Sequence, residues 1–279
     1  MKKRVSNLRS RKKKRALSPV MSTVILTSVI VVLLLVAIGF ANSFLNARIA
    51  ENEFASMKQF MQTVGLQTDD VAWIPGRTQT TRYASKYGQV KFQSLALNYS
   101  FYFDGSPTIN FSYGAGVVLF NMPVRRYSLG DNYFETVFPS SNRFLQNGTS
   151  APVCRVSVVE QLSMVDGDYI RIVVAPIIRY LDSTINDVAY FRLYLPLFVS
   201  GPLLQNSQSI TLSGKNITRL MVSNVNSVTV KLGFPNGNAT GLKSGFFNFD
   251  SVEETFTVPS NSVVEIYTGE VIVALGLYA

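Results

Sequence analysis

The chain contains no histidine and a single cysteine, Cys154, among its 279 residues. One cysteine cannot form an internal disulfide, and without histidine or a second cysteine the usual zinc, haem and Cys-His sites cannot be built. A serine nucleophile would therefore need a lysine as its base. The only SxxK spacing, Ser10 to Lys13, lies in a basic N-terminal stretch, and no GxSxG occurs. These absences predict a protein that is not an enzyme and holds no metal or cofactor.

Acidic residues are missing from the first 15 positions, which hold nine of the 26 basic residues. Beyond Arg15 the remaining 17 bases are matched by 17 acids, so the formal charge of +9 belongs to the N-terminus alone. A neutral body lacks the phosphate-neutralising surface on which nucleic-acid affinity depends, although a local patch at Arg125-Arg126 stays open. We therefore do not expect nucleic acid as a partner.

Charge of either sign is absent from Pro19 to Ala41, where every residue is apolar or small. As a helix this run spans roughly 30 Å, the thickness of a bilayer core. A secretory signal has a shorter apolar region of about 7 to 15 residues. The run therefore predicts a transmembrane helix over about 19–41, with Ser18 as its N-cap and Pro19 in its first turn. The bases before it place the N-terminus in the cytoplasm and the rest of the chain outside.

The helix is expected to continue beyond the membrane to about Val64, for a total length of about 70 Å. Apolar residues recur there every three or four positions, with polar residues on the other faces. Two roles remain open for this stripe: packing on the chain's own globular domain, or packing against other copies as well. Its members are Phe40, Phe44, Ala47, Ala50 or Glu51, Phe54, Met57, Met61 and Val64.

The stretch "KKKRALSPVMSTVILTSVIVVLLLVAIGFANSF" resembles the class III signal and N-terminal helix of archaeal type IV pilin-like proteins. The resemblance covers roughly residues 11 to 45, and "RALSPVMSTV" is its discriminating part. It implies that a prepilin peptidase cuts after Arg15 and Ala16, so that Leu17 becomes the new N-terminus. Bacterial pilins commonly carry a glutamate at the fifth mature position, where this chain has Met21. That departure weakens a bacterial assignment more than an archaeal one, and archaeal flagellins begin differently, with a glycine-rich box.

The resemblance implies a structural subunit, major or minor, of an archaeal type IV pilus-like surface filament. Its helices would self-associate as the filament core, its β domain would form the surface, and a pilus assembly ATPase and a membrane platform protein would be partners. The alternative is a membrane-anchored protein of the cell surface that serves binding or adhesion and does not polymerise.

The rest of the chain alternates apolar and polar residues, as strands do. In "LALNYSFYF" the alternation predicts one face formed by Leu95, Leu97, Tyr99, Phe101 and Phe103. The fold class is therefore α+β: a long N-terminal hydrophobic helix followed by a mostly antiparallel β-sandwich-like domain. We predict a basic leader over 1–16, the helix over 17–64, a crossover segment over 65–90 and an extracytoplasmic β domain over 91–279. The strand stretches are 95–103, 108–113, 116–120, 169–181, 189–199, 217–234 and 262–278.

Few other residues suggest chemistry. Cys154 is expected to be a small buried hydrophobe and Trp73 a core anchor. Asp166 and Asp168 are expected in a hairpin turn, with a calcium ion as the less favoured alternative. The pairs Asp69-Asp70 and Glu253-Glu254 are expected to be solvated loop acids. Five sequons can accept glycans if the domain lies outside the cell, at Asn98, Asn110, Asn147, Asn216 and Asn238.

Overall fold

The computed structural model describes residues 19–104, 109–204, 207–259 and 262–276. It divides into two compact units, Met1–Arg48 and Ile49–Ala279, and each is described here by itself. Helix α1 (Pro19–Ala72) begins in the first unit and ends in the second. The whole β region lies within the second unit.

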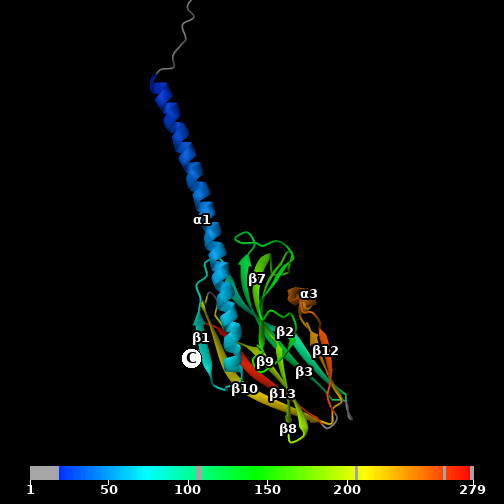
Figure 1. Ribbon diagram of the computed structural model, residues 1–279. Coiled ribbons are helices and arrows are strands. Elements are labelled where there is room, and N and C mark those ends of the chain that lie inside the picture. The colour runs from blue at the N-terminus through cyan, green and yellow to red at the C-terminus, as the bar shows by residue number, and fades with distance from the viewer. Residues whose placement is uncertain (1–18, 105–108, 205–206, 260–261, 277–279) are drawn as a thin grey trace, which may run out of the picture. The chain divides into compact units, whose positions relative to one another are not determined.

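The second unit contains two curled β-sheets, and most neighbouring strands are antiparallel (Figure 1). The pairs β13–β9 and β5–β8 are parallel. The α+β prediction is therefore confirmed. The six-stranded sheet has the order β1 (Thr78–Arg82), β10 (Ser209–Ser223), β13 (Val263–Leu275), β9 (Val188–Leu203), β8 (Ile178–Ile185), β5 (Leu145–Asn147). The seven-stranded sheet has the order β12 (Glu253–Thr257), β11 (Ser227–Gly233), β2 (Gln89–Asp104), β3 (Ile109–Pro123), β7 (Tyr169–Pro176), β6 (Cys154–Gln161), β4 (Tyr133–Phe138).

Two of the predicted strand stretches each divide between the sheets. Stretch 169–181 forms β7 and β8 on either side of Pro176-Ile177, and 217–234 forms β10 and β11. Asn224, between the latter two, has a φ of 59°, a left-handed conformation that asparagine tolerates well. Between β11 and β12 the chain forms two single-turn helices, α2 (Gly237–Thr240) and α3 (Ser244–Phe247).

A first core, which we call the sheet–sheet core, is formed by apolar side chains of both sheets. Leu97, Tyr99, Phe101 and Phe103 of β2 lie in it with no more than 1% of each residue exposed. Leu95 does not join them, and its prediction was wrong: it is 55% exposed with a φ of 50°. The register of β2 against β3 shifts between Gln93 and Leu97, so a bulge turns Leu95 outward.

A second core, the helix–sheet core, lies between the C-terminal part of α1 and both sheets. The helix contributes seven residues whose spacing alternates between four and three positions, each no more than 4% exposed. This is a strict heptad spacing, which places all seven on one face. They are Ala50, Phe54, Met57, Met61, Val64, Thr68 and Val71. The expected stripe is thus confirmed from Ala50 onward, with Ala50 and not Glu51 as its member.

Helix α1 ends at Ala72, eight residues beyond the predicted end at Val64. Thr68 and Val71 continue the stripe, and the Thr68 hydroxyl donates to the Val64 carbonyl at 3.0 Å, so its burial leaves no unpaired donor. The end of the helix lies on two glycines of adjacent strands. A Cβ on Gly214 would lie 2.4 Å from the Val71 carbonyl oxygen, and one on Gly269 would lie 2.3 Å from that of Ala72. Strand β1 then occupies part of the stretch expected to be only a crossover.

Polar contacts hold the same part of α1 at three points. The Glu53 carboxylate accepts the backbone N–H groups of Lys86, Tyr87 and Gly88 at 3.0–3.2 Å. The Lys58 ammonium contacts Glu135 of β4 at 2.5 Å. Asp69 accepts two hydrogen bonds from the Arg179 guanidinium, at 2.9 and 3.0 Å. Partners at 33 to 110 positions along the chain therefore fix the register of the helix on the sheets.

The outer face of the six-stranded sheet carries a buried carboxylate, Glu265, with a side chain 2% exposed. It accepts hydrogen bonds from Arg192 Nε at 2.9 Å, from the Tyr267 hydroxyl at 3.1 Å and from Arg219. Burial raises the pKa of the Glu265 carboxyl, but the hydrogen bonds from Arg219, Arg192 and Tyr267 outweigh burial and hold the pKa below its ordinary value. The charged form is therefore the one that the fold stabilises.

Acid is expected to remove the contribution of Glu265 to stability. Because its pKa is lower in the folded state, the contribution is complete above the ordinary value of about 4.3 and is lost as pH falls through the folded pKa. We expect Glu265→Gln to cost about 1–3 kcal/mol near neutral pH and to flatten the acid dependence. Denaturant unfolding of the parent chain and the variant, between about pH 6 and pH 3, measures both effects. Equal acid slopes for the two proteins would contradict the assignment.

Candidate membrane and assembly segment

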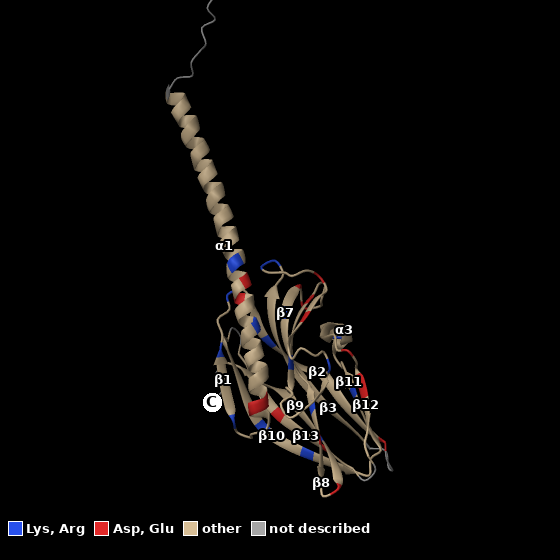
Figure 2. Ribbon diagram, viewed as in Figure 1, with Lys and Arg blue, Asp and Glu red and all other residues tan. Residues whose placement is uncertain are grey.

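The first unit presents an apolar helical surface that its own residues leave uncovered. Every described residue from Val20 to Arg48 is exposed, and large hydrophobic side chains reach 75% exposure at Phe40. The exposed apolar side chains lie on every face of the helix, so one partner surface could not cover all of them. Among the described residues, α1 is the one helix that is long and apolar enough to cross a membrane. Figure 2 shows the N-terminal part of α1 without a charged residue until Arg48.

Three of the hydroxyl side chains in this segment, those of Thr23, Thr27 and Ser28, find partners within the helix itself. The hydroxyl of Thr23 donates to the Val20 carbonyl at 2.9 Å, and that of Ser28 donates to Val24 at 2.8 Å. The Thr27 hydroxyl reaches the carbonyls of Thr23 and Val24, both at 3.0 Å. An unpaired hydroxyl in hydrocarbon costs several kcal/mol, on the order of 4 or more. These local bonds therefore adapt the segment to an environment without water.

The residues predicted for signal cleavage and for the start of the helix lie mostly before the described part of the chain. Arg15, Ala16, Leu17 and Ser18 are outside the described residues. The described part of helix α1 begins at Pro19, where the described residues themselves begin. The cleavage position and the N-cap remain predictions.

The structure limits how much of the apolar stripe on α1 could pack against other copies of the chain. From Ala50 to Val64 it is buried inside the second unit, so this part is not available to other copies. Phe40 and Phe44, by contrast, are exposed in the first unit, at 75% and 52%. Any self-association through the apolar stripe itself therefore falls to its members before Ala50.

The pair Asp69-Asp70 is not in a loop and is not simply solvated, contrary to the prediction. Both residues lie in the last turn of α1. Asp69 binds Arg179 and also accepts the Trp73 indole N–H at 2.7 Å, while Asp70 lies 3.6 Å from Arg77. Arg179 follows Asp69 by 110 positions, so local sequence carried no sign of this pair.

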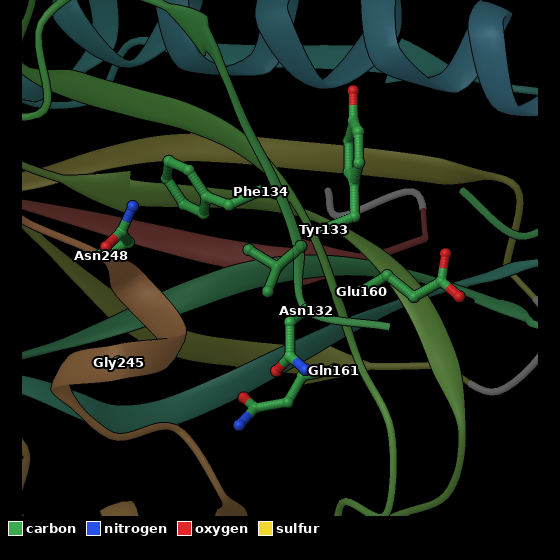
Figure 3. Close-up of a pocket in the computed structure, with 8 residues that line it drawn as sticks. Asn132, Tyr133, Phe134, Glu160, Gln161, Gly245 and Asn248 are labelled. Atoms are coloured by element: carbon green, nitrogen blue, oxygen red, sulfur yellow. The ribbon is translucent and has the colours of Figure 1, made fainter. Parts of the chain in front are cut away.

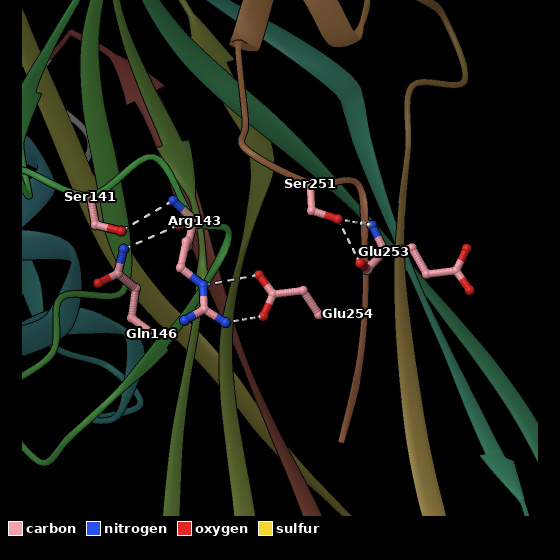
Figure 4. Close-up of polar contacts among 6 residues, drawn as sticks. All are labelled: Ser141, Arg143, Gln146, Ser251, Glu253 and Glu254. Carbon is pink, nitrogen blue, oxygen red and sulfur yellow. Dashed lines mark hydrogen bonds and ion pairs between the residues drawn. The ribbon is translucent and has the colours of Figure 1, made fainter. Parts of the chain in front are cut away.

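The pair Glu253-Glu254 is also structured, because both residues belong to strand β12. Figure 4 shows the Glu254 carboxylate facing the Arg143 guanidinium, with Nη2 at 2.5 Å and Nε at 3.3 Å. Glu253 pairs with Lys231 of the neighbouring strand at 3.1 Å. The Arg143 contact brings the edge strand β12 to the loop before β5.

The other singled-out residues behave as structural elements. Cys154 is fully buried against the helix, and burial raises the pKa of its thiol far above the ordinary value. Trp73 packs on the helix–sheet core and edge-on against Tyr194, with ring centroids 5.3 Å apart. Asp166 lies in the β6–β7 hairpin and binds the buried Arg171 at 2.5 Å, while Asp168 accepts the Ser163 N–H at 2.7 Å. The described residues include no group of three or more acids or cysteines placed to hold a metal ion.

The five sequon asparagines differ in access. The side chain of Asn98 is half-buried and engaged: its Oδ1 accepts the Ser112 hydroxyl at 2.8 Å and its Nδ2 donates to Ser100 at 3.3 Å. The other four, Asn110, Asn147, Asn216 and Asn238, are exposed. Four of the five are thus sterically open to modification.

A surface pocket of about 330 Å³ between β4, β6 and α3 was not foreseen from the sequence (Figure 3). It is lined by residues that are far apart in the chain, so no spacing marks them. They are Asn132, Tyr133, Phe134, Val159, Glu160, Gln161, Gly245 and Asn248.

Comparisons with protein-family models, with curated proteins and with solved structures gave no match for this chain.

Proposed function

We propose that the chain is a structural subunit, major or minor, of an archaeal type IV pilus-like surface filament. The apolar half of α1 forms the filament core with other copies, and the β domain forms the surface. The subunit carries out no catalysis of its own. Before assembly it crosses the cell membrane once, with its N-terminus in the cytoplasm and the β domain outside.

One observation carries this proposal: α1 is a single helix from Pro19 to Ala72 with two different surfaces. Its first part is apolar and exposed all round, and its last part is fixed into a β domain by a buried stripe. A lipid bilayer and a bundle of like helices both satisfy such an exposed surface. The "RALSPV" box adds the processing signal that the resemblance implies.

Removal of the basic leader explains how the helix could move from the lipid bilayer into a filament. The nine bases before Ala16 oppose movement through hydrocarbon, since each charge costs about 2.5–3.5 kcal/mol at the bilayer centre. Once they are removed, the remaining chain is formally neutral and its apolar helix can exchange lipid for neighbouring helices. A pilus assembly ATPase and a membrane platform protein would drive this exchange.

Processing by a prepilin peptidase is expected to produce a chain that begins at Leu17. The full chain is co-expressed with an archaeal prepilin peptidase, and its N-terminus is determined by mass spectrometry. The same chain without the peptidase is the control and should retain Met1 or Lys2. A co-expressed product that still begins there, or one cut well after Ala41, would contradict the proposal.

The second candidate is an anchored surface protein for binding or adhesion that does not polymerise. It is favoured by the uniform exposure of the apolar segment, because lipid alone can cover such a surface. Shearing of surface filaments separates the two candidates. Recovery of the chain in the sheared filaments supports a subunit, and its retention in the membranes supports the anchored protein.

A further inference from the structure

The pocket between β4, β6 and α3 has the chemistry of a binding site for a small neutral molecule. Its volume of about 330 Å³ lies within the range of about 300–1,000 Å³ that is usual for ligand pockets. Three carboxamides line it, from Asn132 before β4, Gln161 at the end of β6 and Asn248 after α3. Each carboxamide carries both donors and an acceptor, and the Asn132 Nδ2 already donates to the Asp131 carboxylate at 3.2 Å.

The backbone conformation explains why asparagine occurs at positions 132 and 248, but it does not explain the glutamine at position 161. Asn132 and Asn248 have φ values of 61° and 48°, a left-handed region in which asparagine is favoured. Gln161 is in a strand, where no such preference applies. Its Oε1 is buried and has no hydrogen-bond partner among the described residues. A buried acceptor left unpaired costs about 1–3 kcal/mol, so a rotation of the Gln161 amide that brought its Oε1 to a ligand hydroxyl would remove that cost.

The apolar part of the pocket comes from Phe134 and Val159. Phe134 packs against the sheet–sheet core, whereas its neighbour Tyr133 packs on the helix–sheet core, so alternation along β4 sends only Phe134 to the pocket side. Figure 3 shows the Tyr133 and Glu160 side chains directed away from Phe134, Asn132 and Gln161. The pocket thus combines an aromatic ring with amides.

Charge is absent from the inner lining. The Glu160 carboxylate already accepts the Leu129 N–H at 2.6 Å, the Gly130 N–H at 3.2 Å and the Ser128 hydroxyl at 2.5 Å. Arg155 lies behind Phe134, with its guanidinium carbon 5.6 Å from that ring's centroid and 3.9 Å from that of Phe249. None of the residues that line the pocket therefore offers an exposed counter-ion to a charged ligand, which favours a neutral one, although the exposed Asp131 lies beside Asn132.

We propose that this pocket binds a neutral sugar of one or two rings. The amides of Asn132, Gln161 and Asn248 would pair with adjacent ring hydroxyls, and Phe134 would contact the apolar C–H face of the ring. Sugars present this combination of clustered hydroxyls and a C–H face. The site lies within the Ile49–Ala279 unit and does not depend on whether the chain polymerises.

Gly245 provides the first test. A Cβ on this glycine meets no atom within 4 Å, so a bulky side chain can be placed at this lining position without a clash. Binding of glucose, mannose, galactose and N-acetylglucosamine to the full chain in detergent micelles is followed by saturation-transfer NMR. We expect saturable binding of at least one sugar, its loss in Gly245→Phe and its retention in Gly245→Ala.

Gln161 provides the second test. Gln161→Met keeps the length of the side chain and is expected to weaken sugar binding about tenfold, as loss of one hydrogen bond does. Gln79→Met is the matched control, because Gln79 also has a buried unpaired Oε1 but lies on β1 outside the pocket. Glucuronate and glucosamine serve as charged comparisons.

Three results would overturn the proposal: no saturable response to any of the four neutral sugars, unchanged affinity in Gly245→Phe, or tighter binding of the charged sugars. None of them bears on cleavage at Leu17, so failure here is distinguishable from failure of the filament proposal.

Discussion

Replacement of Met61 by alanine is expected to destabilise the Ile49–Ala279 unit by about 2–5 kcal/mol. Met61 is the central residue of the heptad stripe and is fully buried between the helix and the sheets. Shortening it removes apolar contacts and leaves a cavity, because the facing β-strands are tied in register and cannot collapse onto the helix. The loss is a large part of the 5–15 kcal/mol that is usual for a folded domain, about a third at the centre of both ranges.

Denaturant unfolding of the full chain in detergent micelles measures this loss. The only tryptophan, Trp73, follows the helix directly and packs on the helix–sheet core, so its fluorescence reports on this region. Leu66→Ala is the matched control, since Leu66 is on the same helix but 50% exposed, and we expect it to change stability by less than about 1 kcal/mol. Equal losses in the two variants would show that the stripe is not what fixes the helix.

Replacement of Leu33 by arginine is expected to remove most of the chain from the membrane fraction and from any filament. Leu33 lies near the middle of the apolar segment and is 62% exposed. An arginine near the bilayer centre costs about 2.5–3.5 kcal/mol, which corresponds to a roughly 100-fold change in partition. In a helix bundle the same charge would be buried without a partner, so both environments are affected.

Carbonate extraction of membranes, followed by quantification of the chain in pellet and supernatant, measures this effect. Leu33→Met retains size and apolarity and should remain with the parent chain in the pellet. A Leu33→Arg chain that is retained to the same extent as the parent would contradict a membrane role for the segment.

The features that depend on local spacing could be predicted from the sequence. The helical character of the uncharged run follows from its composition, and the stripe from Ala50 to Val64 follows from its three-and-four spacing. The fold class follows from the change to alternating residues beyond the helix. Each of these features depends on residues that are close together in the sequence, within a few helical turns or within one strand.

Features that depend on one residue's backbone or on distant partners could not be predicted. Alternation places Leu95 inside, and only the bulge between Gln93 and Leu97 reverses it. The acids of Asp69-Asp70 look solvated until the fold brings Arg179 to the helix. The pocket amides come from three separated segments, and Asn132 and Asn248 look like ordinary turn residues in the sequence.

The helix–sheet core also determines how the chain would carry a mechanical load. Its seven helix residues are spread over about 32 Å along the helix axis, from Ala50 to Val71. A pull along α1 would load these contacts together in shear, along with the Glu53, Lys58 and Asp69 bonds, and would not peel them apart one at a time. The β domain is therefore attached to its helix over about 32 Å of the helix axis and not at a single point.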